Sequence, residues 1–396
     1  MTSEAATVTI NPRVVREVRE RLNLSRAEAV TRVNAQLRRD DSELVDGQVI
    51  AAWESGSRPE VTVEQAEALA RTLLLPISSL FDEEPTPNPL LDFRLAAGAK
   101  AANLSYETWE KLFTFDQFYR LARRIAARLA ITEAVALPSA EAFDLSLETH
   151  LEHFAAAMRS ALGISDELQE RWETDAEARI ALTTAVEALG VFVFSQPLNT
   201  AECRGASRWE AGGPPAILLP TADTDSARSF TLIHELSHLC LRSADGQTVI
   251  CDPSRRRPTR RDEQIANYLA GAVLAPASVI GRLVDGSEPA DSYRNWPYSQ
   301  RRALKRALNV SHGVIGIRLE QLGIVKDAGV PKAMWAMPGR RPRGGGKARS
   351  VRYSSYLGAR TLDLVKSAID SGKASVGEVT TVLQIKSKDV VALLGA

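Results

Sequence analysis

The segment Phe230-Thr231-Leu232-Ile233-His234-Glu235-Leu236-Ser237-His238-Leu239 places two histidines four residues apart, with a glutamate directly after the first. Residues i and i+4 of a helix share one face, so His234 and His238 are predicted to bind a single metal ion. Glu235 would then act on the metal-bound water. The competing interpretation is an amphipathic helix that carries two ordinary histidines.

Two features favour the metal site. The whole chain has five histidines, and two of them fall at this spacing. The flanks also predict a helix, because Ser229 can cap its start and a broad apolar stripe runs along it. The stripe contains Phe230, Leu232, Ile233, Leu236, Leu239 and Leu241. The pattern is H-E-x-x-H, which is typical of zinc metallopeptidases.

Zinc sites of this type use three protein ligands and keep one position for water. The segment 262–276 repeats apolar residues at helical intervals and ends in a proline, so it predicts a second helix. Glu263, near its start, is the expected third ligand, although acids also favour helix N-termini for structural reasons alone. Asp262 and Asp252 are alternative ligands, and His312 is a more distant one.

Together the two segments resemble the ImmA/IrrE-type metallopeptidase family, whose members carry F-T-L-x-H-E-x-x-H followed by E-x-x-A-N-x-F-A and a leucine–proline end. The resemblance covers about 190–276, and it implies an α+β zinc peptidase domain. Leu269 replaces the usual phenylalanine of that pattern, and Ala275 replaces a bulkier residue. The second motif consists here of Glu263, Ala266, Asn267, Ala270, Leu274 and Pro276.

Three short strands are predicted before the first motif, at Gly190–Phe194, Cys203–Trp209 and Pro215–Leu219, with turn residues between them. We expect a small sheet beside the two zinc helices. An unpaired edge strand can hold a substrate backbone by strand addition. The second or the third of these strands is the expected substrate edge.

The expected chemistry is hydrolysis by activated water. Zinc lowers the pKa of its bound water and polarises the scissile carbonyl, while Glu235 takes the proton and passes it to the leaving amine. Tyr293, Arg294 and His312 are candidates for stabilising the oxyanion, and the sequence does not choose among them.

The N-terminal region is predicted to be a bundle of short helices. An apolar stripe runs from Val14 to Leu22, and Ser25 with Glu28 forms a capping box for the next helix. From about 11 to 81 the chain resembles an Xre/Cro-type helix-turn-helix domain, including its Trp-Glu turn that ends in proline at 59. Trp53 itself is expected in the core.

That resemblance implies that the helix at about 47–54 enters the major groove of DNA. Gln48 and Ala51 are then expected to face bases, with Asp46 as a further candidate, and Arg26 and Arg58 are expected DNA contacts. Two observations weigh against this prediction. The connection 34–45 is longer than the usual tight turn, and residues 1–85 hold ten Arg or Lys against fifteen Asp or Glu.

Length and composition bound the remaining possibilities. With 396 residues the chain has room for two to three domains, and its formal net charge of zero names no partner. No apolar run is long enough to span a bilayer and Met1–Ile10 lacks a signal-peptide core, so a cytoplasmic protein is expected. Cys203, Cys240 and Cys251 lack metal-ligand spacing, and Cys240 is expected to be buried.

We therefore predict a multidomain, mainly α protein with five parts. They are a helix-turn-helix head at 1–85, a helical spacer at 86–189, the peptidase domain at 190–335, a basic glycine-rich linker at 336–352 and a small helical element at 353–396. Helices are expected at Ser105–Leu129, Leu137–Leu162, Asp166–Leu189, Tyr353–Ile369 and, as two short ones, within Ser375–Leu394.

The expected function is that of a zinc-dependent transcriptional regulator that binds operator DNA and cleaves a partner protein. The resemblance implies that this partner is a repressor or is linked to a toxin. The alternative is an antitoxin or ligand-sensing regulator that uses the zinc fold to bind without turnover. A homodimer is possible in either case, because helix-turn-helix proteins commonly bind inverted repeats as dimers.

Overall fold

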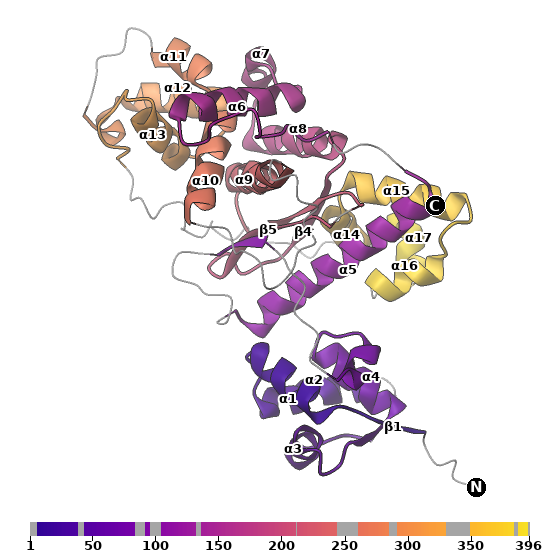
Figure 1. Cartoon of the computed structure of the whole chain (residues 1–396). Coiled ribbons are helices and arrows are strands. Elements are labelled where there is room, and N and C mark those ends of the chain that lie inside the picture. The colour runs from indigo at the N-terminus through magenta and orange to yellow at the C-terminus, as the bar shows by residue number, and fades with distance from the viewer. Residues whose placement is uncertain are drawn as a thin grey trace. The chain divides into compact units, whose positions relative to one another are not determined.

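A computed structural model describes residues 6–38, 43–83, 92–95, 104–131, 136–210, 212–243, 260–284, 291–329, 349–383 and 387–394. These residues are mainly helical, with two small sheets (Figure 1). The chain divides into two compact units. Unit 1 holds residues 1–89 and 99–113, and unit 2 holds 90–98 and 114–396. The predicted mainly α, multidomain fold class is confirmed.

Unit 1 is a small helical bundle with a two-stranded sheet. Its main elements, in chain order, are β1 (Thr7–Thr9), α1 (Pro12–Arg21), α2 (Arg26–Leu37), α3 (Gly47–Ser55), β2 (Glu60–Thr62), α4 (Val63–Thr72) and the 3-10 helix η1 (Ile77–Phe81). β1 and β2 pair antiparallel. The predicted capping box is present, since Ser25 and Glu28 exchange hydrogen bonds at the start of α2. Trp53 is buried in the core, as expected.

Polar contacts fix α3 within this bundle. Glu54 is buried and forms ion pairs with Arg19, also buried, and with Arg26, whose Nε lies 2.7 Å from Oε2. The side chain of Asn34 donates to the carbonyl of Val45 and accepts from its amide, both at 2.8 Å. Asn34, near the end of α2, and Val45, just before α3, are therefore hydrogen-bonded across the long connection between the two helices.

Unit 2 is built on a four-stranded sheet with the order β3-β5-β6-β4. The strands are β3 (Asp92–Leu95), β4 (Phe192–Gln196), β5 (Cys203–Arg208) and β6 (Ala216–Pro220). β4 and β6 run parallel, and the other two pairings are antiparallel. The three strands predicted before the motif are present, shifted by two residues or fewer. The two strands predicted as a substrate edge, β5 and β6, each have a neighbour on both sides, so neither is an unpaired edge in this sheet.

Helices cover both faces of this sheet (Figure 1). On one face α8 (Asp175–Ala188) packs on β4, and α9 (Asp225–Ser243) packs on β5 and β6. α10 (Arg260–Leu274) packs on α9, and α6 (Glu148–Ala161) packs on α10. On the other face α5 (Tyr106–Arg128) brings Phe115 and Phe118 within 5.7 and 5.9 Å of the Phe194 ring, centroid to centroid.

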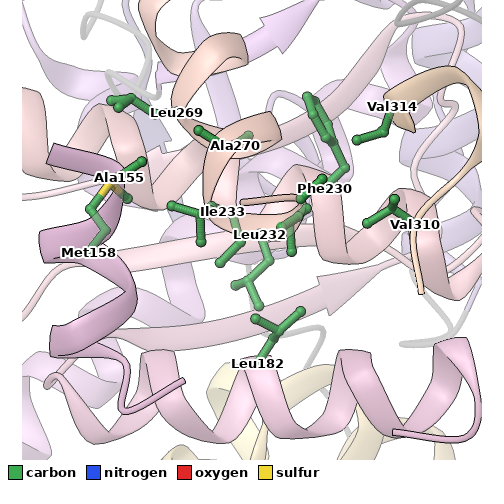
Figure 2. Close-up of a cluster of buried hydrophobic side chains, with 14 of the residues drawn as sticks. Ala155, Met158, Leu182, Phe230, Leu232, Ile233, Leu269, Ala270, Val310 and Val314 are labelled. Carbon is green, nitrogen blue, oxygen red and sulfur yellow. The ribbon is translucent and has the colours of Figure 1, made fainter. Parts of the chain in front are cut away.

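The main core surrounds α9. Figure 2 shows Leu232 and Ile233 of α9 between Leu182 of α8 and Leu269 of α10. All four side chains are buried. Burial of apolar surface contributes roughly 25 cal/mol per Å², so packing of these side chains stabilises the unit by several kcal/mol or more. Within the described residues no single helix is long and apolar enough to cross a membrane; only the pair α10 and α11 (Ala277–Val284), bent by 55°, passes on combined length and composition.

Several predicted helices are interrupted. The helix expected from Leu137 begins only at Glu148, after a stretch of turns and bends over 140–147 in which Asp144 accepts hydrogen bonds from the backbone N–H and the hydroxyl of Ser146. The expected 166–189 helix is two helices, α7 (Asp166–Glu170) and α8. α9 begins at Asp225, so Ser229 lies inside it and is not its cap. Cys251 and the part of the predicted linker at 336–348 lie outside the described residues.

The remaining elements complete unit 2. After α11 come η3 (Tyr293–Asn295), α12 (Tyr298–Leu308) and α13 (His312–Gln321). Four helices follow near the C-terminus: α14 (Arg349–Leu357), α15 (Ala359–Asp370), α16 (Val376–Leu383) and α17 (Ser387–Leu393). The predicted 353–369 helix is thus split at Gly358, whereas the two short helices predicted after it are present.

Gly358 marks the place where the C-terminal helices meet the sheet. Its φ is +73°, which favours glycine, and a Cβ there would lie 2.4 Å from the carbonyl oxygen of Val193. Next to it, the backbone N–H of Arg360 donates to Oε1 of Glu187 at 3.3 Å. Burial raises the pKa of Glu187 to about 7, although the contact with Arg360 opposes this shift.

This buried carboxyl should make unit 2 less stable as the pH rises. The pKa of Glu187 is about 7 in the folded chain against an ordinary 4.5, so between these values the unfolded chain binds fewer protons and the free energy of unfolding falls. Glu187→Gln removes this titration and should gain up to about 3 kcal/mol over the wild type above pH 7. Denaturant unfolding at about pH 5 and about pH 8 measures it, and an equal difference at both would contradict the assignment.

Candidate metal centre

Two helices bring the metal-ligand candidates together. α9 places His234 and His238 one turn apart, both buried, and α10 places Glu263 in its first turn. The Nε2 atoms of the histidines are 3.1 Å apart. Oε2 of Glu263 lies 3.5 Å from Nε2 of His234, and Oε1 lies 3.3 Å from Nε2 of His238.

These residues have the donor set of a zinc site. One ligand atom from each of His234, His238 and Glu263 lies within 4.8 Å of the others, so a single cation can reach all three. Two imidazole nitrogens and one carboxylate oxygen form a set that is common in catalytic zinc centres. The residues present therefore fit a divalent metal ion of this kind.

The three side chains interact electrostatically. Burial alone would raise the pKa of Glu263, but hydrogen bonds from both histidines and their charges lower it well below its usual range. For His238, burial lowers the pKa, while the contact with Glu263 and the nearby Glu235 and Asp262 raise it overall. The pocket thus favours positive charge, and a bound cation would take the place of the protons.

Glu235 is fully buried and lies against the sheet. A Cβ placed on Gly205 of β5 would lie 3.0 Å from Oε1 of Glu235 and 2.5 Å from Cγ2 of Thr231. Only glycine lets the strand pass so close to α9. The sequence analysis missed Gly205, although a glycine inside a predicted strand often marks a close backbone approach.

The other predicted site residues are not among these three ligands. Tyr293 and His312 share a hydrogen bond of 2.8 Å between the phenol oxygen and Nδ1, and neither they nor Asp262 belong to the described cluster of three ligands. Asp252 lies outside the described residues. Closer by, the ring of Phe230 stacks on that of His234, with centroids 6.2 Å apart.

The residues expected to contact DNA lie on unit 1. Gln48 and Arg58 are exposed, and Ala51 is half-buried on α3. Asp46 accepts hydrogen bonds from the amides of Gln48 and Val49, so its carboxylate is the N-cap of α3. Arg26 is half exposed and is held by Glu54.

The segment that contains α9, α10 and three strands of the sheet matches a known protein family. Residues 186–320 match the IrrE N-terminal-like domain (Peptidase_M78). This match confirms the predicted family resemblance for the segment that carries the ligand cluster, and it identifies a metallopeptidase-type domain. It also covers β4, β5 and β6 but not β3. A comparison of the chain with curated proteins gave no match.

Metal content should depend on the histidines and not on Glu235. We expect about one zinc per chain in protein purified without added metal, and a loss of most of it in the double variant His234→Ala/His238→Ala, because two of three ligands disappear. Glu235→Gln is the matched control on the same helix and should keep its zinc. Elemental analysis checks this, and unchanged metal in the double variant would refute the site.

Proposed function

We propose that the chain is a cytoplasmic, zinc-dependent regulator whose peptidase domain cleaves a partner protein and whose head binds DNA. The observation that carries the peptidase assignment is the convergence of His234, His238 and Glu263, with Glu235 in the next helical position after the first ligand. A metal site, a base and a buried setting are the parts that water-mediated hydrolysis requires.

His234, His238 and Glu263 would hold the ion. Zinc in such a site supplies Lewis-acid chemistry, which acidifies water and polarises a carbonyl. Glu235 accepts the proton of the attacking water and then delivers it to the leaving amine, so one carboxylate serves as base and acid in turn. Because its side chain is buried, the surroundings of low polarity strengthen its interaction with charge that develops nearby.

The geometry around Glu235 supports a role in catalysis over one in folding. A glutamate buried only for stability would be costly, since burying a charge is unfavourable without compensation. Here the carboxylate lies beside two buried histidines, where a divalent cation would offset that cost. A chain that used this fold solely to bind a partner would have no chemical need of a base at this position.

Cleavage should require Glu235 while capture of a partner should not. Incubated with the proteins encoded beside its gene, the wild type is expected to produce a single cut that a chelator abolishes. Glu235→Gln should lower the rate by at least about 100-fold, because general base catalysis contributes on that order, and should retain zinc. Mass spectrometry of the products locates the cut.

The same variant separates the two function classes. Should neither wild type nor Glu235→Gln cleave any neighbouring protein while both bind one and neutralise its toxicity, the domain is a binding module and the peptidase proposal fails. Equal cleavage by both proteins would instead remove Glu235 from the mechanism.

For the head, we propose operator binding through α3. This short helix begins at an Asp46 cap and presents exposed Gln48, and it packs on α1 and α2 as a recognition helix would. Two of the acidic side chains nearby have structural roles, since Asp46 caps the helix and Glu54 is buried between arginines. The surface of α3 is therefore less acidic than the count of charged residues in 1–85 suggests.

Deletion of the head should abolish DNA binding, and substitutions on or next to α3 should weaken it. We expect the protein to protect an inverted repeat in its own promoter region, and Gln48→Ala to relax base preference at a cost of about 1–3 kcal/mol. Arg58→Ala should weaken binding to all sequences alike, because a phosphate contact carries no base preference. Footprinting at low salt tests this, and protection that survives deletion of residues 1–85 would place DNA binding elsewhere.

A further inference from the structure

Strand β3 occupies the edge of the sheet next to β5, the strand that contacts the metal-ligand helix α9. Figure 2 shows α9 between α8 and α10. α9 covers β5 and β6, and the ligand cluster is formed by side chains of α9 and α10.

The register places β3 next to the strand residue closest to Glu235. β3 runs antiparallel to β5, with Arg94 opposite Gly205 and Leu95 opposite Cys203. Gly205 is the position where a Cβ would come within 3.0 Å of the Glu235 carboxylate. Paired strands lie about 4.8 Å apart, so the backbone of β3 runs one strand spacing from that position.

β3 lies outside the segment that matches the peptidase family, although it belongs to the same compact unit. The family match spans 186–320 and includes β4, β5 and β6, whereas β3 comes from almost a hundred residues earlier. In sequence it lies between two stretches assigned to unit 1, 1–89 and 99–113. Without β3, β5 would be the open edge of the peptidase sheet, and an open edge accepts an extended peptide.

The pairing is short and irregular. β3 has four residues, and its register with β5 shifts between Arg94 and Leu95. A two-stranded contact of this length contributes little stability of its own. It gains most from being tethered, because an attached segment acts at an effective concentration on the order of millimolar.

We propose that β3 occupies the edge of β5 at which a substrate would bind. An extended segment of a protein substrate then displaces β3 and pairs antiparallel with β5. This rests on the proposed peptidase function. The substrate would be an extended main chain that is free to make strand hydrogen bonds. In the resting state, the protein's own strand β3 would block the site.

The first test asks whether β3 lies on β5 in solution. Leu95→Cys puts a cysteine at the register position paired with Cys203, and Cβ atoms at directly opposed positions of a strand pair lie about 4.5–5.5 Å apart, close to disulfide range. Diamide, or a short bis-thiol reagent, should link the two within one chain. The matched control Leu95→Cys/Cys203→Ser should not link, and failure of both reagents in the single variant would overturn the pairing.

The second test asks whether β3 competes with an added strand. The probe is a fluorescent peptide with the sequence of residues 90–97, and all proteins carry Glu235→Gln so that nothing is cleaved. Phe93→Pro removes a strand N–H and should bind the peptide at least about tenfold more tightly than the protein with native β3. Oxidised Leu95→Cys should not bind it, and reduction should restore the affinity of the unlinked chain.

Each outcome decides the proposal. Equal peptide binding by oxidised and reduced Leu95→Cys would show that the edge of β5 is not where the peptide goes, and would overturn it even if Phe93→Pro fails to fold. Because the readout is binding in a Glu235→Gln background, competition can be confirmed in a protein that proves to lack peptidase activity. The failure of either proposal is thus recognised separately.

Discussion

The contact between α9 and the sheet on one side and α10 on the other is the constraint on which unit 2 depends. α9 is buried over 229–240, and its apolar residues pack in three directions, toward α8, toward α10 and toward β5 and β6. This leaves the His234 and His238 face of the helix directed at Glu263, and it leaves Glu235 directed at the strand. The ligands are therefore positioned by the core and need no loop to carry them, which is the arrangement that preorganised sites require.

Much of this centre could be predicted from the sequence because its information is local. The spacing of His234 and His238 on a helix, and the helical repeat after Glu263, each need only a dozen residues to be recognised. The same holds for the three strands before α9 and for the Ser25 capping box. Local patterns are enough to predict the two helices and to indicate Glu263 as the third ligand, and the family resemblance supports that choice.

What the sequence analysis missed depends on distant contacts. β3 pairs with a strand over a hundred residues later, and its four residues alternate in polarity over too short a stretch to predict a strand on their own. Because β3 is not predicted, the sequence pattern leaves β5 as a possible edge strand. The break at Gly358 similarly arises because the chain must pass against the carbonyl of Val193, a tertiary demand that overrides the helical pattern on both sides.

The hydrogen bonds between Asn34 and Val45 affect how much the length of the connection between α2 and α3 can vary. One amide side chain binds both the N–H and the carbonyl of Val45, as a neighbouring strand would, so the start of α3 is anchored to α2 directly. The number of residues between the two anchor points is then largely uncoupled from the placement of α3. Lengthening a closed loop costs only about 0.6 kcal/mol for each doubling, so this connection is a natural position for inserting a reporter or an epitope without disturbing the helices around it.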